Sequence, residues 1–282
     1  MRLPKIFKNI YYKYLLSFLR KQVAVNLKFK DKYKGQECYI IGNGYSIKYF
    51  DLKKFQNKIS FGCNNLFYHS DFSQLNCKFY ITVHSSIYSP YWFNPYSKKL
   101  SYNFFSKEYK RKILENNHIN FFVNLNDYFF TKNLDNVFYL SNFNNEINFD
   151  NFGDPSNFFQ YTTSSIETMI SLAYFLGFKK LYIVGCDYLL YPTMCGRFYE
   201  NHNEEIIKNF NSTSWKDEFF NNVSKKIDVK IISYEKNFQS KYFEVIDYSE
   251  YFSTDKKLKK NYEIVTKKNL KLLKNFNMEY SI

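Results

Sequence analysis

Short runs of hydrophobic residues alternate with amphipathic stretches along most of the chain. The runs end in polar or glycine-containing turns, which predicts buried β-strands. The stretches between them carry apolar residues at helical spacing and predict helices. Strands that alternate with helices are typical of an α/β fold with a Rossmann-like, mostly parallel sheet and helices on both faces. The predicted strands are residues 37–41, 58–63, 78–83, 119–123, 137–140, 180–184 and 229–233, and the predicted helices are residues 47–55, 107–116, 163–176 and 204–226.

The chain divides into a sheet domain and two basic ends. We expect the Rossmann-like domain to span residues 35–250. Within it, residues 86–160 are weakly periodic and rich in Asn, Tyr, Phe and Ser, which predicts a small lid subdomain that contacts a second substrate. Residues 1–34 predict a basic amphipathic helix that either lies on a membrane surface or packs on the main domain. Residues 251–282 form a lysine-rich C-terminal tail.

The formal net charge of +14 over 282 residues indicates an acidic partner, for which nucleic acid, an anionic membrane and a phosphorylated substrate all qualify. The basic ends lack a recognition helix and an RNA-binding signature, so we expect no nucleic acid and favour anionic lipid. The apolar stretch near the N-terminus is too short for a signal peptide or a spanning helix. We therefore expect a cytoplasmic protein with peripheral contact at the inner membrane. Five widely spaced cysteines without a C-x-x-C pair predict reduced thiols.

The loop Gly42-Asn43-Gly44 follows the first predicted strand and precedes a predicted helix. Glycines at such a turn let a ligand approach the backbone closely, and the amides at a helix start can bind a phosphate. A sharp turn between strand and helix also favours Asn and Gly by itself, so the loop can be purely structural. No G-K-[ST] follows and the pattern GxGxxG is absent. The loop therefore fits a mononucleotide better than a Walker A site or a dinucleotide site.

Polar residues also follow two further predicted strands. Asn64 and Asn65 can read a ribose, a base or a sugar hydroxyl, or they can form an Asx turn. After residues 180–184, Gly185 leads to Asp187, which can orient a ligand, hold backbone amides of the adjoining loop or bind a metal. The chain has no D-x-D triplet, and we therefore expect neither a metal site nor a cofactor.

Two of the four histidines are predicted to lie near the carboxyl ends of strands. His202 and His84 are the candidates for a general base, because histidine titrates near neutral pH. Arg197 and Tyr199 shortly precede His202, and both can face a departing phosphate. The other two histidines are predicted to be ordinary turn residues.

Three segments of the chain resemble a known family. The sequences CYIIGNGYSIKYFDLKKF, FGCNNLFYH and TTSSIETMISLAYFLGFKKLYIVGCDY are similar to the bacterial sialyltransferases of glycosyltransferase family 42. They are also similar to the related 6-hydroxymethylpterin pyrophosphokinase-like domain (domain of unknown function 115). The resemblance spans residues 36–235 and implies a GT-A-like variant of the Rossmann-like fold. Tyr45 stands where the sialyltransferases have a proline in their GNGPS loop.

The resemblance implies a donor site for the cytidine monophosphate (CMP) part of a CMP-sugar. In the family, tyrosines beyond the G-x-D segment stabilise the leaving phosphate, a part that Tyr188, Tyr191 or Tyr199 would take here. A later histidine acts as the base; this chain reads Asn-Ser-Thr at 211–213 where the family has it, and His202 would take the proton instead. The residues that correspond to the family's donor site are Gly42, Asn43, Gly44, Ser46, Asn64, Thr163, Ser164, Ser165, Gly185 and Asp187, with Asn65 beside them.

The function implied by the resemblance is that of a metal-independent, inverting glycosyltransferase. It would transfer sialic acid or a related nonulosonate from a CMP-sugar to a bacterial surface glycan such as lipopolysaccharide, lipooligosaccharide or capsule. Its partners would be the nucleotide-sugar donor, which is a substrate rather than a cofactor, and a glycan or glycolipid acceptor. Two other functions stay open: an ATP-dependent pterin-type diphosphotransferase, and a non-catalytic nucleotide-binding member of a glycan-assembly complex. The sequence also leaves a homo-oligomer open.

Overall fold

A computed structural model describes residues 14, 17–83, 87–90, 92, 101–141, 154–156, 164–200, 207–208, 214–254 and 258–276. Three residues of the predicted site, His84, Thr163 and His202, lie outside the described residues. So do residues 1–13 and 15–16 of the predicted N-terminal helix.

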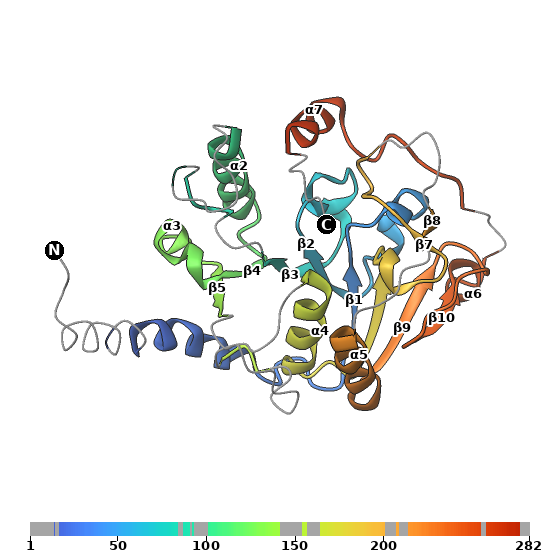
Figure 1. Cartoon of the computed structure of the whole chain (residues 1–282), viewed down its shortest axis with the longest axis horizontal. Helices are drawn as coiled ribbons and strands as arrows, with labels where there is room; N and C mark the ends of the chain where they lie inside the picture. The colour runs from blue at the N-terminus through green and yellow to red at the C-terminus, as the bar shows by residue number, and fades with distance from the viewer. Residues whose placement is uncertain are drawn as a thin grey trace.

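Eight strands form one sheet, in the order β10-β9-β6-β1-β2-β3-β4-β5 (Figure 1). Each neighbouring pair runs parallel; Cys38 of β1, for example, is in register with Leu181 of β6 on one side and Ile59 of β2 on the other. The α/β fold with a parallel sheet is therefore confirmed. The strands are β1 Glu37–Ile41, β2 Ile59–Cys63, β3 Cys77–Thr82, β4 Asn120–Asn124, β5 Val137–Leu140, β6 Lys180–Val184, β9 Asp228–Ser233 and β10 Glu244–Asp247.

The strand order reverses beside β1. The chain lays down β1 to β5 toward one edge of the sheet and then returns to place β6, β9 and β10 on the other side of β1. In open parallel sheets, ligands bind outside the carboxyl ends of the strands at such a reversal. The segments that follow β1 and β6 are Gly42-Asn43-Gly44 and Gly185-Cys186-Asp187, so both predicted motifs lie at this point.

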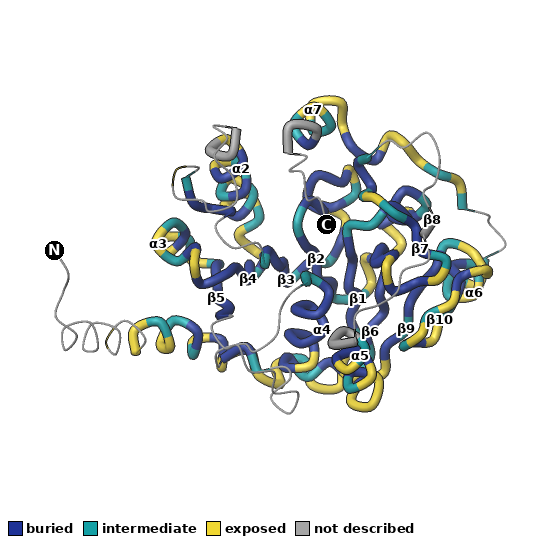
Figure 2. Tube along the Cα trace, viewed as in Figure 1, coloured by how far each residue is buried: buried dark blue, intermediate teal, exposed yellow. Residues whose placement is uncertain are grey.

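Helices cover both faces of the sheet, and buried residues fill the space between the layers (Figure 2). Alternate residues of β1 point to opposite faces: Cys38 and Ile40 belong to one hydrophobic core, Tyr39 and Ile41 to the other. The first core packs against α4 (Ser165–Phe175) and α5 (Ser214–Lys226). The second packs against α2 (Ser101–Glu115), α6 (Tyr248–Tyr251) and α7 (Lys267–Phe276).

Two of the predicted helices differ from the structure. Residues 47–55 form two 3-10 helices, η2 (Tyr45–Tyr49) and η3 (Leu52–Phe55), because the backbone is extended at Phe50 and Asp51 and the Asp51 carboxylate accepts from Lys53 N. The helix predicted from residue 204 begins only at Ser214. Residues 207–208 instead form β8 (Ile207–Lys208), which pairs antiparallel with β7 (Thr193–Met194).

The region predicted to be a lid belongs to the sheet domain wherever the structure describes it. Residues 120–124 and 137–140 are β4 and β5, so they extend the main sheet. Helix α2 and the short helix α3 (Tyr128–Thr131) pack on it, and Tyr109 and Ile113 of α2 are buried. Residues 101–141 thus contribute two strands and packed helices to the sheet, and their apolar side chains belong to its core.

Both basic ends of the described chain contact the domain. Residues 17–24 are helical and continue into the 3-10 helix η1 (Val25–Phe29), where Phe29 packs edge to face on Phe138. Near the C-terminus, Ile264, Val265 and Leu273 are buried, and α7 lies beside α2.

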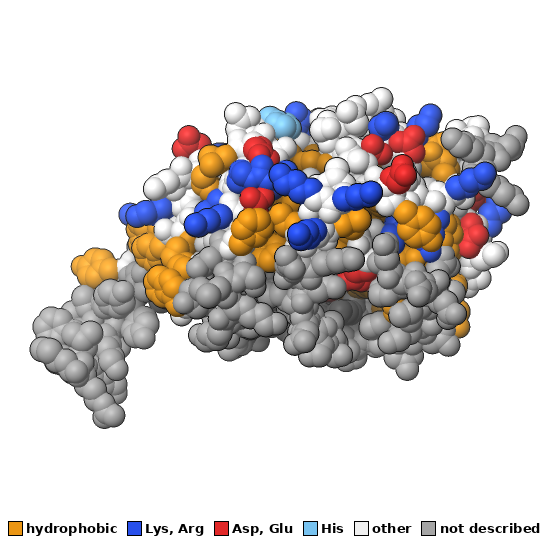
Figure 3. All heavy atoms as spheres, turned by 90° about the horizontal axis from the view of Figure 1, so that it is seen from above, with side chains coloured by type: hydrophobic (Ala, Val, Ile, Leu, Met, Phe, Trp, Pro, Cys, Tyr) orange, Lys and Arg blue, Asp and Glu red, His pale blue; other side chains and the backbone are white. Residues whose placement is uncertain are grey.

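None of the described helices has the length and apolar character needed to span a bilayer. On the face seen from above, Lys and Arg side chains are spread among acidic and hydrophobic ones (Figure 3).

Candidate functional site

The loops that follow β1 and β6 pack directly on each other. Gly42 N donates to Val184 O at 2.7 Å, and Gly44 N donates to Gly185 O at 2.8 Å. A Cβ atom on Gly42 would collide with Gly185 O and Cys186 Sγ, and one on Gly44 would lie 2.6 Å from Asp187 Oδ2. The two glycines are therefore required for contact between the loops, in addition to any contact with a ligand.

Asp187 is buried and holds the segment that follows the glycine loop. Ser46 N donates to Asp187 Oδ2 at 2.8 Å, and Ser46 Oγ donates to Asp187 Oδ1. Burial raises the pKa of Asp187 to about 6, and the hydrogen bonds from Ser46 act in the opposite direction. Of the three roles considered for Asp187, the structure shows the one in which it holds backbone amides. The amide of Ser46 at the start of η2 is thus occupied by Asp187, and the prediction that the helix after the loop offers its amides to a phosphate is wrong for Ser46.

Residues 197–200 form a third loop, which lies against the glycine loop. Phe198 N donates to Asn43 O at 3.3 Å, and Gly44 and Arg197 form an isolated antiparallel bridge. Lys48 Nζ donates to Glu200 O. Burial, and after it the charge of Lys260, lower the pKa of Lys48 to about 8. The segment that contains Arg197 and Tyr199 is thus held against both the glycine loop and η2.

A chain of hydrogen bonds joins α2 to this third loop. Tyr109 Oη donates to Asn65 Oδ1 at 2.7 Å, and Asn65 Nδ2 donates to Tyr199 Oη at 2.9 Å. Arg197 Nη1 donates to the same Tyr199 oxygen at 3.0 Å. Burial raises the pKa of Tyr199 although the neighbouring guanidinium lowers it, so the phenol stays protonated. The structure therefore brings together the predicted residues Arg197, Tyr199 and Asn65.

The start of α4 completes the site on the other side of Asn65. Ser164 caps the helix, and its side chain accepts from Glu167 N at 3.5 Å. Asn64 adopts a left-handed backbone with φ of 51°, and its Nδ2 donates to Ser165 Oγ at 3.1 Å. The Tyr188 hydroxyl is hydrogen-bonded to Ser164 and its desolvation raises the Tyr188 pKa, whereas the side chain as a whole is partly exposed. Tyr188 thus belongs to the α4 side of the site and Tyr199 to the glycine-loop side.

One polar atom at the centre of this arrangement has no partner within the part of the chain that the structure describes. Asn43 Oδ1 is buried and accepts no hydrogen bond there. A buried carbonyl oxygen of this kind costs free energy unless a donor reaches it. A ligand with an amino or hydroxyl group in the loop would supply that donor.

Three groups of the site interact favourably with an anion. Arg197 supplies a cation, although its Nη1 also lies 4.0 Å from Glu200 Oε1; Tyr199 supplies a neutral hydroxyl, and α4 the positive end of its helix dipole. In the described ranges of the chain, no group of three or more His, Cys, Asp or Glu side chains is placed to hold a metal ion.

Sequence reasoning missed Lys48 and Tyr109. Tyr109 shares the buried face of α2 with Phe105 and Ile113, so its spacing indicates only a core residue. Lys48 lies one turn after the glycine loop, and its burial depends on the distant residues 197–200 and 258–262. No signal in the sequence indicates either role.

Comparisons with known proteins find solved structures whose fold is only weakly similar to that of this chain. No family model and no curated protein matches the chain. The chain is similar in structure to the sialyltransferase CstII from Campylobacter jejuni. With CstII in complex with CMP-3FNeuAc the identity is 17% and the TM-score 0.41, over 85% of this chain and 99% of that chain. With CstII in complex with cytidine-5'-monophosphate the values are 18% and 0.38, over 70% and 79%. Similarity at this level does not reveal the activity of this chain.

Proposed function

We propose that the protein is a glycosyltransferase that takes a nonulosonate such as sialic acid from a CMP-sugar and transfers it to a glycan or glycolipid acceptor. The observation that carries the proposal is the convergence of three loops at the reversal of strand order. They present Asn43 and Arg197 with Tyr199 on one side, and Asn64, which follows β2, lies with the start of α4 on the other. The loops after β1 and β6, Asn64 and the start of α4 belong to the segments in which the sequence resembles family 42, whereas residues 197–200 lie outside those segments.

The hydrogen-bonding groups of these residues match those of a nucleoside monophosphate. A nucleobase amino group or a ribose hydroxyl would satisfy the buried oxygen of Asn43. The phosphate would lie near the Arg197 guanidinium and the Tyr199 hydroxyl, which can donate hydrogen bonds without a metal ion. The donor is consumed in the reaction and is a substrate rather than a cofactor.

The proposed reaction is a single displacement with inversion. An acceptor hydroxyl oxygen forms a bond to the anomeric carbon of the sugar while the bond from that carbon to the phosphate oxygen breaks. The bonding electrons stay on the departing CMP, whose phosphate gains negative charge. Arg197 and Tyr199 stabilise this charge, because preorganised donors are most effective where charge develops. The acceptor proton goes to a general base, for which His202 is proposed first and His84 second.

The test is the thermal stabilisation of the purified protein by CMP, CDP, UDP, GDP and ATP, each with and without Mg²⁺. A ligand that binds the folded state raises the melting temperature by linkage. We expect CMP to give the largest increase and the increase to persist in EDTA. A shift with ATP that requires Mg²⁺ would instead favour the diphosphotransferase, and no shift with any nucleotide would contradict a nucleotide site.

A further inference from the structure

We propose that Asn65 and Tyr109 are positioning residues that determine where the Tyr199 hydroxyl sends its hydrogen. The proposal rests on the proposed function in one respect, namely that a phosphate is the group that receives this hydrogen. Neither residue needs to touch the substrate. Asn65 acts through its hydrogen bond to Tyr199, which is buried beside Arg197, and Tyr109 acts through its hydrogen bond to Asn65.

The Tyr199 oxygen already accepts two hydrogen bonds. A phenol oxygen has two acceptor positions and one hydrogen. One position is taken by Asn65 Nδ2 at 2.9 Å and the other by Arg197 Nη1 at 3.0 Å, and a guanidinium can only donate. The hydroxyl hydrogen must therefore point away from both donors. In the residues that the structure describes, no acceptor receives it, so it is available to a ligand.

Asn65 could remove this hydrogen if its amide were reversed. With its oxygen facing Tyr199, Asn65 would accept the phenol hydrogen and nothing would remain for a ligand. In the structure Tyr109 Oη donates to Asn65 Oδ1 at 2.7 Å, and as long as Tyr109 is the donor of this bond the NH₂ group of Asn65 faces Tyr199. Asn65 is 2% exposed, so water is excluded as an alternative partner.

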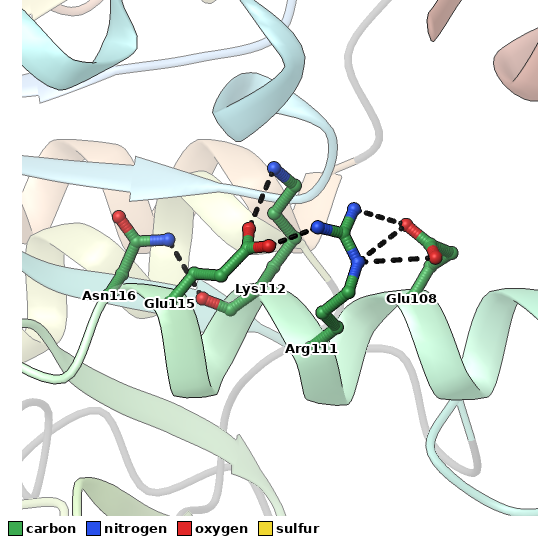
Figure 4. Close-up of polar contacts among 5 residues, drawn as sticks. All are labelled: Glu108, Arg111, Lys112, Glu115 and Asn116. Carbon is green, nitrogen blue, oxygen red and sulfur yellow. Dashed lines mark hydrogen bonds and ion pairs between the residues drawn. The ribbon is translucent and has the colours of Figure 1, made fainter.

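Helix α2 holds the Tyr109 hydroxyl in place. The Tyr109 ring packs edge to face on Phe67 at 5.0 Å and on Tyr88 at 6.0 Å. The opposite side of the helix carries a ladder of ion pairs, in which Arg111 lies between Glu108 and Glu115 (Figure 4). The buried and exposed sides of α2 are thus clearly distinguished, and Tyr109 lies on the buried side, where its hydroxyl reaches Asn65.

The substitution Asn65→Asp tests the proposal most sharply. A carboxylate has nearly the shape of the amide but only accepts, so it would take hydrogens from both Tyr109 and Tyr199. The Tyr199 hydrogen would then be lost to the ligand, as it is in Tyr199→Phe. The two variants and the double variant are titrated calorimetrically with CMP, with cytidine and with inorganic phosphate.

We expect Tyr199→Phe and Asn65→Asp each to weaken CMP and phosphate binding about tenfold, the effect of one hydrogen bond to a charged group. The double variant should be no weaker than the single variants, and cytidine affinity should not change. Tyr139→Phe, which removes a buried phenol bonded to Thr131 at 3.2 Å on a different part of the sheet, is the matched control and should bind like the wild type.

If the losses of CMP and phosphate affinity in the two single variants multiply in the double variant, the proposal is overturned. Such a result would show that the introduced carboxylate acts through charge repulsion alone. Unchanged binding by Asn65→Asp would also overturn it. Binding of phosphate but not of CMP by the wild type would contradict the proposed donor. The phosphate titrations of the same variants would then still decide the role of Asn65. A wild-type protein that binds neither would overturn both.

Discussion

Lys48 donates a hydrogen bond from its Nζ atom to the backbone oxygen of Glu200, although the residue is only 2% exposed. Its ammonium also lies 4.3 Å from the centroid of the Tyr45 ring, and the ammonium of Lys260 lies 4.6 Å from the same ring. A buried cation close to a second cation is costly, which is why the pKa of Lys48 falls to about 8. In return, Lys48 connects the glycine loop, the third loop and the C-terminal segment.

This burial makes stability depend on pH above neutrality. Because the folded-state pKa of Lys48 lies below its ordinary value of 10.5, the folded protein loses the proton first, and stability rises as the pH increases through 8. Between pH 7 and pH 9 we expect the wild type to gain about 1 kcal/mol relative to Lys48→Met, after allowance for solvent screening of the ammonium. Urea unfolding of both proteins at the two pH values measures the difference. A constant difference would show that Lys48 titrates normally.

Asp187 has the opposite dependence, in the acidic range. Its folded-state pKa of about 6 lies above the ordinary value of 3.8, so the folded protein holds its proton more tightly. The stabilisation is present at low pH and is lost as the pH rises through 6. Relative to Asp187→Asn, the wild type should lose about 2 kcal/mol of unfolding free energy between pH 4 and pH 7. Equal pH profiles for the two proteins would argue against the burial of this carboxylate.

Much of the sheet follows from the local sequence. The apolar runs at 37–41 and 180–184 predict β1 and β6 correctly, and the helix predicted over residues 163–176 corresponds to α4. Residues 47–55 also look helical, and the prediction fails there because the extended backbone at Phe50 and Asp51 divides them.

The assembly of the site is less accessible to sequence reasoning. Asn65 is 44 residues from Tyr109 and 134 from Tyr199, so their contacts depend on strand order and on the packing of α2. The sequence around Tyr199, with Arg197 two residues before it, indicates that Tyr199 can face a phosphate. Its hydrogen bond from Asn65 is seen only in the folded protein. Likewise, the sequence leaves open whether the glycines of the loop serve a ligand or only the turn, and it gives no sign that their closest contacts are with Gly185 and Asp187.

Gly42→Ala tests the contact between the loops. The added methyl group would overlap Gly185 O and Cys186 Sγ, so the loops would separate and the unfolding free energy should fall by about 1–3 kcal/mol. CMP affinity should fall with it. Gly35→Ala is the control, since a Cβ at Gly35 meets nothing within 4 Å and its positive φ accounts for only a modest loss of stability. A loss at Gly42 no larger than at Gly35 would contradict the close packing.

Asn64 combines a left-handed backbone with a hydrogen bond to Ser165, and two substitutions separate these properties. Asn64→Gly keeps the backbone without strain but removes the side chain, whereas Asn64→Ala also strains the backbone by about 1 kcal/mol. We expect the glycine variant to be the more stable in thermal unfolding. If the side chain contacts the ligand, both variants should lose CMP affinity equally; full affinity in Asn64→Gly would restrict Asn64 to a structural role.

The most direct measurement is the release of CMP from CMP-sialic acid in the presence of EDTA and a panel of glycan acceptors, with the wild type compared with Tyr199→Phe. Loss of one preorganised donor to the leaving phosphate typically slows such a reaction about 100-fold. We expect the wild type to release CMP in an acceptor-dependent manner without metal and Tyr199→Phe to be slower by about this factor. Acceptor-dependent release at the same rate in Tyr199→Phe, or no release by the wild type with any acceptor despite binding of CMP, would contradict the proposed glycosyltransferase activity.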